Sequence, residues 1–319
     1  MRKVLKKTLP STRRISILFL LLNVVLWGAA LPIVKPALDS TSPFLFLFYR
    51  FVLAAILSFP VLVYYWPKVD RKHHAIFKII VSESIGTTLA LGLLYAGLER
   101  TSAVEASLIV TTTPIFITIG GLLFLKEKVE RHEMFGLGLA FIGTVALTLE
   151  PFFSGQTLQL TGSTLGNFLV LLQNLATAAY FIIAKKHYKG IPKLFVTSVS
   201  FYVGLISFFI IDWVISNNSM TVFLTNAKLD LSVSTVQWAV LYMALFGSII
   251  GLTAYIKGQD GIEASEAGIF TYLQPLVFIP LSVIWLRESI STYSIVTVVL
   301  ITIGVFLAEF KRQVRVKKK

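Results

Sequence analysis

The chain has 319 residues, 55% of them hydrophobic, and a formal net charge of +13. Its mean hydropathy of +0.79 excludes an ordinary soluble domain, because a compact water-soluble fold cannot bury that much apolar surface. The chain contains no cysteine, which excludes disulfide bonds, thiolate metal sites and cysteine nucleophiles.

Ten apolar runs follow one another along the chain. A helical run of about 20 residues crosses about 30 Å of hydrocarbon, and continuous runs do not fit the alternating pattern of a membrane β-barrel. The predicted spans are Ile15–Val34, Phe44–Tyr65, Ile79–Leu98, Ala103–Leu125, Met134–Leu149, Thr164–Ala184, Leu194–Ile215, Val236–Ile256, Ala264–Leu286 and Ile290–Ala308. We therefore predict an all-α polytopic membrane protein with ten transmembrane helices.

The basic residues predict how these spans are oriented. Most of the 29 Lys and Arg residues lie near the two ends of the chain and in the loops that fall on the same side as those ends. The positive-inside rule then places both termini in the cytoplasm of a cell-membrane protein. Because basic loops facing anionic headgroups account for the net charge, we expect a lipid bilayer and no nucleic acid as partner.

The second half of the chain repeats the first. A shift of 161 residues places Glu105 on Glu266 and Pro114 on Pro275. An odd number of spans in each unit inverts the second unit in the membrane, and transporters often place their site between such units. We therefore predict two inverted five-helix repeats, residues 15–149 and 164–308, that form one functional unit.

Several short motifs follow one another in a fixed order. They are Trp27-Gly28 … Lys35, Tyr49-Arg50-Phe51, Thr101-Ser102-Ala103, Thr113-Pro114-Ile115-Phe116, Leu125-Lys126-Glu127 and Gly136 … Gly143. In their order and spacing these motifs resemble the EamA-type branch of the drug/metabolite transporter superfamily. The resemblance covers about Ile15 to Ala308. It implies a ten-helix carrier that moves small metabolites, often amino acids, and that frequently moves them outward. The second repeat departs from it, with Thr177-Ala178-Ala179-Tyr180 where the family often has Trp, and Gln274 before Pro275.

Polar side chains inside the spans are the candidates for a substrate site, because such residues are costly in lipid and tend to face a cavity or the bundle interior. Asn23 and Trp27 share one helix face, and Gln173, Thr177 and Tyr180 repeat that face in the second unit. We expect these two faces to line one shared cavity; the alternative is interhelical hydrogen bonding.

Glu83 and Thr87 also share a helix face, in the third span. A carboxylate at this position can bind a substrate amine or carry a proton. The alternative is that Glu83 lies near the cytoplasmic interface and pairs with Lys78 or Lys126.

Two prolines and one arginine complete the predicted site. Pro114 and Pro275 lie in mid-span and predict helix kinks. The neighbouring Thr112, Tyr272 and Gln274 are expected to satisfy the freed carbonyls or to contact substrate. Arg50 is expected to have a structural or gating role; it can attract an anionic substrate, or its stem can extend outward to the interface.

These features favour a secondary transporter or exporter of small metabolites over an enzyme. The sequence has no nucleophile–base arrangement, phosphate-binding glycine loop or metal cluster, so we expect no cofactor and no metal. Sparse buried charge favours amino acids or similar neutral or zwitterionic solutes, moved by alternating access between the repeats. A multidrug or hydrophobic-compound exporter is the first alternative, and a membrane-embedded enzyme or assembly factor the second. Substrate identity, direction, proton coupling and oligomeric state stay open.

Overall fold

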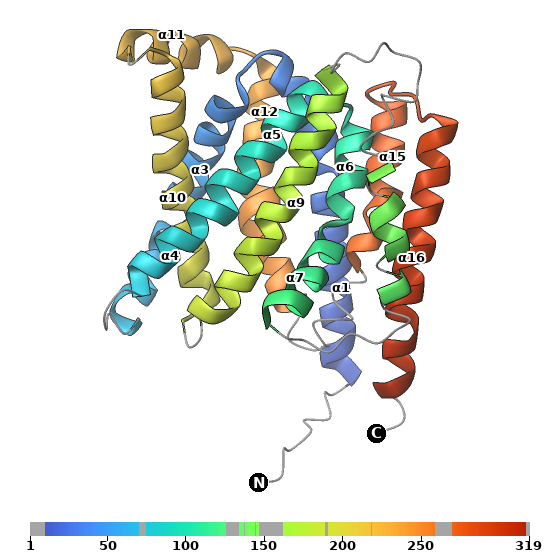
Figure 1. Cartoon of the computed structure of the whole chain (residues 1–319). Coiled ribbons are helices and arrows are strands. Elements are labelled where there is room, and N and C mark those ends of the chain that lie inside the picture. Colours follow the sequence, from blue (N-terminus) through green and yellow to red (C-terminus); the bar gives the residue numbers. More distant parts are fainter. Residues whose placement is uncertain are drawn as a thin grey trace.

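Every secondary-structure element in the described part of the chain is a helix. The computed structural model describes residues 10–69, 75–125, 134–136, 138–143, 145–146, 162–188, 191–217, 219–258 and 270–316. Long helices run side by side between two ends of the molecule, and the first helix begins at the end where the last helix finishes (Figure 1).

The first half of the chain forms helices that are interrupted at several points. They are α1 (Pro10–Gly28), α2 (Ala30–Val34), η1 (Lys35–Asp39), α3 (Pro43–Tyr65), η2 (Trp66–Lys68), α4 (Ala75–Glu83), η3 (Ser84–Leu89), α5 (Ala90–Arg100), α6 (Ala103–Thr111) and α7 (Thr113–Leu125). The segment η3 is a π-helix between α4 and α5. Ser42 and Ser102 cap α3 and α6, each accepting a backbone N–H bond at 3.1 Å, which explains why these helices begin where they do.

The second half of the chain also forms interrupted helices. Its helices are α9 (Gly162–His187), α10 (Lys193–Ile215), α11 (Met220–Asp230), α12 (Ser234–Tyr242), η4 (Met243–Ile250), α13 (Gly251–Gly258), η5 (Phe270–Leu273), α15 (Pro275–Ile284) and α16 (Thr292–Val316). The segment η4 is again a π-helix, here between α12 and α13. The short helix α11 lies across one end of the bundle (Figure 1).

Seven helical segments are long and apolar enough to cross a membrane. They are Arg13–Asp39, Pro43–Lys68, Ile76–Arg100, Ala103–Phe124, Ser163–Ala184, Lys193–Ile215 and Ser234–Gly258. Shorter apolar helices at Met134–Gly143, Pro275–Ile284 and Ile295–Gly304 lie where the fifth, ninth and tenth spans are predicted. The all-helical, multi-pass membrane fold is confirmed, and the count of ten spans stays a prediction.

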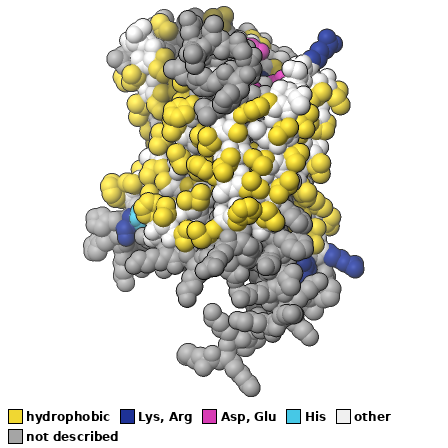
Figure 2. Space-filling model, turned by 45° about the vertical axis from the view of Figure 1, so that its right-hand side comes forward, with side chains coloured by type: hydrophobic (Ala, Val, Ile, Leu, Met, Phe, Trp, Pro, Cys, Tyr) yellow, Lys and Arg dark blue, Asp and Glu magenta, His cyan; other side chains and the backbone are white. Residues whose placement is uncertain are grey.

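The surface of the bundle matches a lipid environment. Hydrophobic side chains cover the middle of the face shown in Figure 2, and the charged side chains visible there lie towards the two ends. Large apolar side chains such as Leu18, Phe59 and Ile206 are more than half exposed. In water this would be a large unfavourable surface, whereas in a bilayer it faces hydrocarbon.

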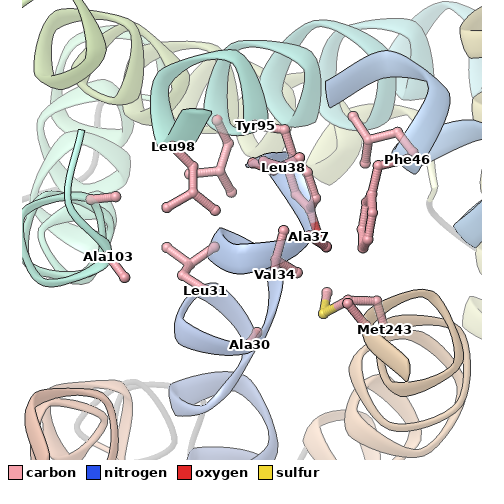
Figure 3. Close-up of a cluster of buried hydrophobic side chains, with 14 of the residues drawn as sticks. Ala30, Leu31, Val34, Ala37, Leu38, Phe46, Tyr95, Leu98, Ala103 and Met243 are labelled. Carbon is pink, nitrogen blue, oxygen red and sulfur yellow. The ribbon is translucent and has the colours of Figure 1, made fainter. Parts of the chain in front are cut away.

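The most extensive contacts between helices join the two halves of the chain. Helix α3 packs along α10, α5 packs along α9, and α1 packs along α13. One apolar core runs between these pairs. In Figure 3, Val34, Leu38, Phe46, Tyr95 and Met243 come together from the end of the first span, α3, α5 and η4. The halves are therefore interleaved around a common core.

Helices α5 and α9 approach so closely that their backbones meet. A Cβ atom on Gly97 would lie 2.7 Å from the carbonyl oxygen of Gly166, and one on Gly166 would lie 2.8 Å from that of Gly97. Small residues permit such close packing between membrane helices.

We expect Gly97→Val to lower the melting temperature in detergent by about 5 °C or more, because a side chain there forces α5 and α9 apart and overpacking costs about 1–3 kcal/mol or more. Gly138→Ala is the matched control, because nothing lies within 4 Å of a Cβ at that position. Equal melting temperatures for the two variants would show that the close contact does not stabilise the fold.

Candidate functional site

A buried carboxylate, Glu83, links the third span to the second half of the chain. Its side chain is 2% exposed. It accepts hydrogen bonds from the hydroxyls of Thr87 at 2.8 Å, Tyr180 at 2.9 Å and Tyr188 at 2.7 Å. Lys78 forms no ion pair with it among the described residues, and Lys126 lies outside them. The alternative pairing with Lys78 is therefore not what the structure shows.

The Glu83 cluster, meaning Glu83, Thr87, Tyr180 and Tyr188, extends to a further helix. The hydroxyl of Thr87 lies 2.6 Å from that of Ser200 on α10. Burial, reinforced by the charge of Glu83, raises the pKa of Tyr188, so this hydroxyl stays protonated and acts as a donor. The cluster therefore joins the third, sixth and seventh predicted spans through hydroxyl donors.

Asn23 and Trp27 pack against the eighth predicted span instead. The Asn23 side-chain amide donates to the carbonyl of Gly251 at 3.0 Å, and the Trp27 indole donates to that of Gly247 at 3.0 Å. The Trp27 ring also stacks on Tyr255, with centroids 5.3 Å apart. The two residues thus share one helix face as predicted, and that face is docked onto η4 and α13.

The aromatic residues of the first and sixth spans occupy related places. The Tyr180 ring lies against Gly86 in η3, where a Cβ would come within 2.4 Å of it. The Trp27 ring lies against Gly251, directly after η4, where a Cβ would come within 2.7 Å. Each aromatic therefore packs on a glycine at a π-helical segment of the opposite half, and π-helical segments are frequent at functional sites.

The expected single cavity around Asn23, Trp27, Gln173 and Tyr180 is not visible as a set of contacts. Among the described residues, no hydrogen bond or ring contact joins the Asn23–Trp27 pair to Tyr180. Gln173 donates to Thr177 at 2.7 Å on its own helix. Its Oε1 atom is buried and has no hydrogen-bond partner among the described residues. Gln173 thus has an acceptor available inside the bundle, as a substrate contact requires.

The predicted kink at Pro114 is present as a break in the fourth span. Helix α6 ends at Thr111 and α7 begins at Thr113. The hydroxyls of Thr111, Thr112 and Thr113 donate to the carbonyls of Leu108, Ile109 and Val110. These threonines therefore satisfy the carbonyls around the break, as predicted. The hydroxyl of Thr112 is fully buried and occupied by these bonds.

Pro275 lies at a similar break in the ninth predicted span. The short helix η5 ends at Leu273, and α15 begins at Pro275 with Gln274 directly before it. Gln274 is buried. The side chain of Tyr272 lies outside the described residues, so its predicted substrate contact stays a prediction.

Arg50 joins three spans in the interior and does not extend outward. Its side chain is 9% exposed. Nε donates to Ser248 in η4 at 3.1 Å, and Nη1 donates to Tyr95 on α5 at 3.0 Å. The predicted structural role is consistent with these bonds. Among the described residues, no group of three or more His, Asp or Glu side chains can hold a metal.

Sequence reasoning missed Asn174 and Glu288. Asn174 is fully buried and bridges the break in the fourth span, donating to the carbonyl of Ile109 at 2.8 Å. Glu288 accepts the backbone N–H groups of Ala103 and Val104 at 2.7 and 2.9 Å and so caps α6. The shift of 161 residues that relates the two repeats places Glu127 of the Leu125-Lys126-Glu127 motif on Glu288, but the sequence does not show which helix this carboxylate caps.

Lys35 and a pair of aspartates form further bonds at the end where Glu288 lies. Within the first half, Lys35 donates to the carbonyls of Leu98 and Glu99, in the last turn of α5, at 2.7 and 3.0 Å. Asp212 accepts from Ser42 at 2.9 Å. Asp230 accepts from Thr41 and Tyr49. The first and second spans are therefore tied to groups from several others at this end.

Asp230 makes the stability of this end depend on pH. Burial raises the pKa of Asp230, although the Thr41 and Tyr49 hydroxyls oppose the shift. The folded protein therefore holds this proton more tightly than the unfolded chain. The resulting stabilisation is present below the unfolded-state pKa and is lost as pH rises through the folded-state pKa.

We expect the melting temperature of the wild type to fall by a few degrees relative to Asp230→Asn as pH is raised from about 4 to about 7. Asn keeps the shape of the side chain and cannot ionise. Thermal melts of both proteins in the same detergent across this range test the expectation. A difference that is constant with pH would contradict it.

Several known proteins of similar sequence are named as transporters. The uncharacterized transporter YetK of Bacillus subtilis is 26% identical over 292 residues, covering 90% of this chain and 84% of the relative. An uncharacterized transporter of Archaeoglobus fulgidus is 24% identical, covering 92% and 97%. A WAT1-related chloroplast protein of Arabidopsis thaliana is 25% identical, covering 89% and 67%.

A solved crystal structure shares the fold, with a TM-score of 0.59 at 15% sequence identity over 95% of this chain and 98% of the other. The profile of the EamA-like transporter family matches twice, at residues 14–149 and 164–310. Together with the multi-pass helical fold, these matches identify a membrane transporter rather than an enzyme. The chain belongs to the EamA-like transporter family.

Proposed function

We propose that this protein is a secondary transporter of small metabolites that works by alternating access between two inverted five-helix repeats, residues 15–149 and 164–308. Amino acids or similar neutral or zwitterionic solutes are the proposed substrates. Both termini lie in the cytoplasm, and the spans cross the cell membrane. The substrate moves past Gln173 and the polar breaks of the fourth and ninth spans.

The reciprocal pairing of helices carries this proposal. A two-fold axis in the membrane plane exchanges the first span with the sixth and the third with the eighth. Trp27 of the first span packs on the π-helical segment of the eighth, and Tyr180 of the sixth packs on that of the third. The helices α3 and α10, which this axis also exchanges, pack on each other. These pairs support inverted repeats.

Two sets of bonds are suited to act as opposite gates. At one end, Glu288 caps α6 and Lys35 binds the end of α5. At the other, the Glu83 cluster joins the third, sixth and seventh spans. Glu288 at one end and the Glu83 cluster at the other connect the two halves, so breaking one link while the other persists would open the interior to one side. Alternating access requires this asymmetry between the two ends.

Flux into proteoliposomes without ATP tests the transport proposal. Purified protein is reconstituted, and uptake of radiolabelled amino acids is followed against protein-free vesicles. We expect saturable uptake of at least one amino acid that leaves the solute chemically unchanged. Uptake confined to a hydrophobic cation such as ethidium would favour the multidrug alternative, and covalent conversion of the solute would favour an enzyme.

The topology has its own test, and the absence of native cysteine makes it simple. Ser232 precedes α12, and Lys68 ends η2; both are exposed and lie at opposite ends of the proposed spans. We expect Ser232→Cys to react with a membrane-impermeant thiol reagent in intact cells, and Lys68→Cys to react only after lysis. Labelling of Lys68→Cys in intact cells would contradict the proposed orientation.

A further inference from the structure

Arg50 is a buried cation whose hydrogen bonds are all to neutral groups. Its hydrogen-bond partners among the described residues are the hydroxyls of Ser248 and Tyr95, at 3.1 and 3.0 Å, and its guanidinium carbon lies 5.3 Å from the centre of the Phe51 ring. No described carboxylate forms an ion pair with it, and its Nη2 atom donates to no described residue. A guanidinium cannot lose its proton in a protein, so its positive charge persists inside the bundle.

A buried charge without a counter-ion is costly, and two hydroxyl groups and one aromatic ring offset only part of that cost. A structural link between three spans does not need a charged residue, because neutral amides make the same kind of bond elsewhere in this protein. The arrangement is instead suited to an anion that supplies the missing charge when it enters. Intramembrane ionisable residues commonly mark substrate pathways for this reason.

The groups around Arg50 suit one carboxylate. The planar guanidinium presents parallel N–H donors that match the two oxygens of a carboxylate. Tyr95 and Ser248 each accept a bond from Arg50 and keep their own hydroxyl hydrogen to donate. One positive charge with these donors balances one negative charge. A dianionic phosphate would need a second cation, and Lys35 is held by backbone carbonyls at the end of α5.

Glu83 does not share this site. Tyr95, which holds Arg50, is twelve positions after Glu83 on the third span, or about 18 Å along a helix. The ammonium and carboxylate groups of an amino acid are attached to a single carbon atom and cannot span that distance. A solute bound at Arg50 therefore leaves its ammonium group to neutral acceptors.

We infer that Arg50, with the hydroxyls of Tyr95 and Ser248, binds the carboxylate group of the transported solute, so that the substrate class is amino acids and other small monocarboxylates. The inference rests on the proposed transport function and adds to it the residue that recognises the anionic group. This role also accounts for the position of Arg50, which bonds to Ser248 in the second half and to Tyr95 in the first.

Binding measurements test the inference directly. The wild type in detergent is melted with each of the twenty L-amino acids, and the most stabilising one is compared with its decarboxylated amine and its carboxamide. We expect stabilisation by the amino acid and little by the other two. We expect Arg50→Gln to weaken binding of the amino acid about 10- to 100-fold, the range for losing a bond to a charged group, with Arg50→Lys in between.

Matched variants separate recognition from folding. Arg100→Gln removes an arginine that is exposed and pairs with Glu99, so it should bind the amino acid like the wild type. If Arg50→Gln does not fold, Tyr95→Phe keeps the cation and removes one hydroxyl. It should weaken the amino acid a few-fold and leave the amine unchanged. Equal effects of Tyr95→Phe on both probes would overturn the inference.

The remaining outcomes distinguish this inference from the transport proposal. If the amine stabilises as well as the amino acid, or only chloride stabilises, Arg50 does not recognise a solute carboxylate. If liposomes accumulate solutes without a carboxylate as fast as amino acids, transport stands and the inference fails. If the amino acid binds through Arg50 but is never moved, the anion site stands and the transport proposal fails.

Discussion

Replacing Glu83 by alanine should reduce transport at least tenfold and lower the stability of the protein by about 3 kcal/mol or more. The substitution leaves two partly buried hydroxyls, those of Tyr180 and Tyr188, without their acceptor, while Thr87 keeps only its contact with Ser200. Each stranded group costs about 1–3 kcal/mol. The third, sixth and seventh spans would then lose their common bond. Uptake in liposomes and thermal melting of the purified variant measure the two effects.

Two further variants show which property of Glu83 matters. Ser84→Ala removes an exposed hydroxyl next to Glu83 on the same span, whose bond is to the carbonyl of Ile80 in its own helix, and should leave transport unchanged. Glu83→Gln keeps one acceptor and should give fluxes between the wild type and alanine, with exchange and net uptake falling together. If Glu83→Gln lost only uphill accumulation and kept exchange, Glu83 would instead be the proton-coupling group. Normal transport by Glu83→Ala would remove the cluster from the mechanism.

The sequence predicted the helical membrane fold because hydropathy is a property of each segment alone. Apolar runs identified seven spans that the structure contains as long apolar helices. The three other predicted spans are shorter helices in the described residues, and the prolines at 275 and 280 explain part of this, since proline interrupts the backbone bonding of a helix. The break at Pro114 was predictable for the same reason, as was its repair by threonine hydroxyls.

The partners of the polar residues were not predictable, because they depend on which helices lie side by side. Periodicity correctly placed Asn23 and Trp27 on one face, yet that face packs on Gly247 and Gly251. Nothing local in the sequence identifies these backbone carbonyls as acceptors. The π-helical segments η3 and η4 likewise follow from tertiary packing and have no propensity signal.

Charged residues show the same division between local and tertiary information. Glu105 lies near the start of the predicted fourth span, Ala103–Leu125, and the structure has it in the first turn of α6. Glu288 caps that same helix from 185 residues away in the chain, which only the fold can specify. For Glu83, the helix face shared with Thr87 was correct, while the two tyrosines that complete its cluster come from the second half.

Trp27→Ala should lower transport about tenfold or more, because Trp27 holds the first span on the eighth. The ring stacks on Tyr255 and the indole donates to Gly247 at 3.0 Å. Removing a large aromatic from such a contact costs about 3–5 kcal/mol when it is fully buried, and less here because Trp27 is partly exposed.

Trp27→Phe separates the two contributions of this side chain. It keeps an aromatic ring beside Tyr255 and loses only the bond to Gly247, which is worth about 1 kcal/mol, so it should retain most of the flux. Tyr180→Phe also keeps its ring and loses one hydrogen bond, the one to Glu83. If the two inverted repeats alternate, the flux of Tyr180→Phe should fall by about as much as that of Trp27→Phe. Uptake rates of Trp27→Ala, Trp27→Phe and Tyr180→Phe at equal reconstituted protein decide this. A Trp27→Ala protein that transports like the wild type would mean that the first and eighth spans need not stay docked during the cycle.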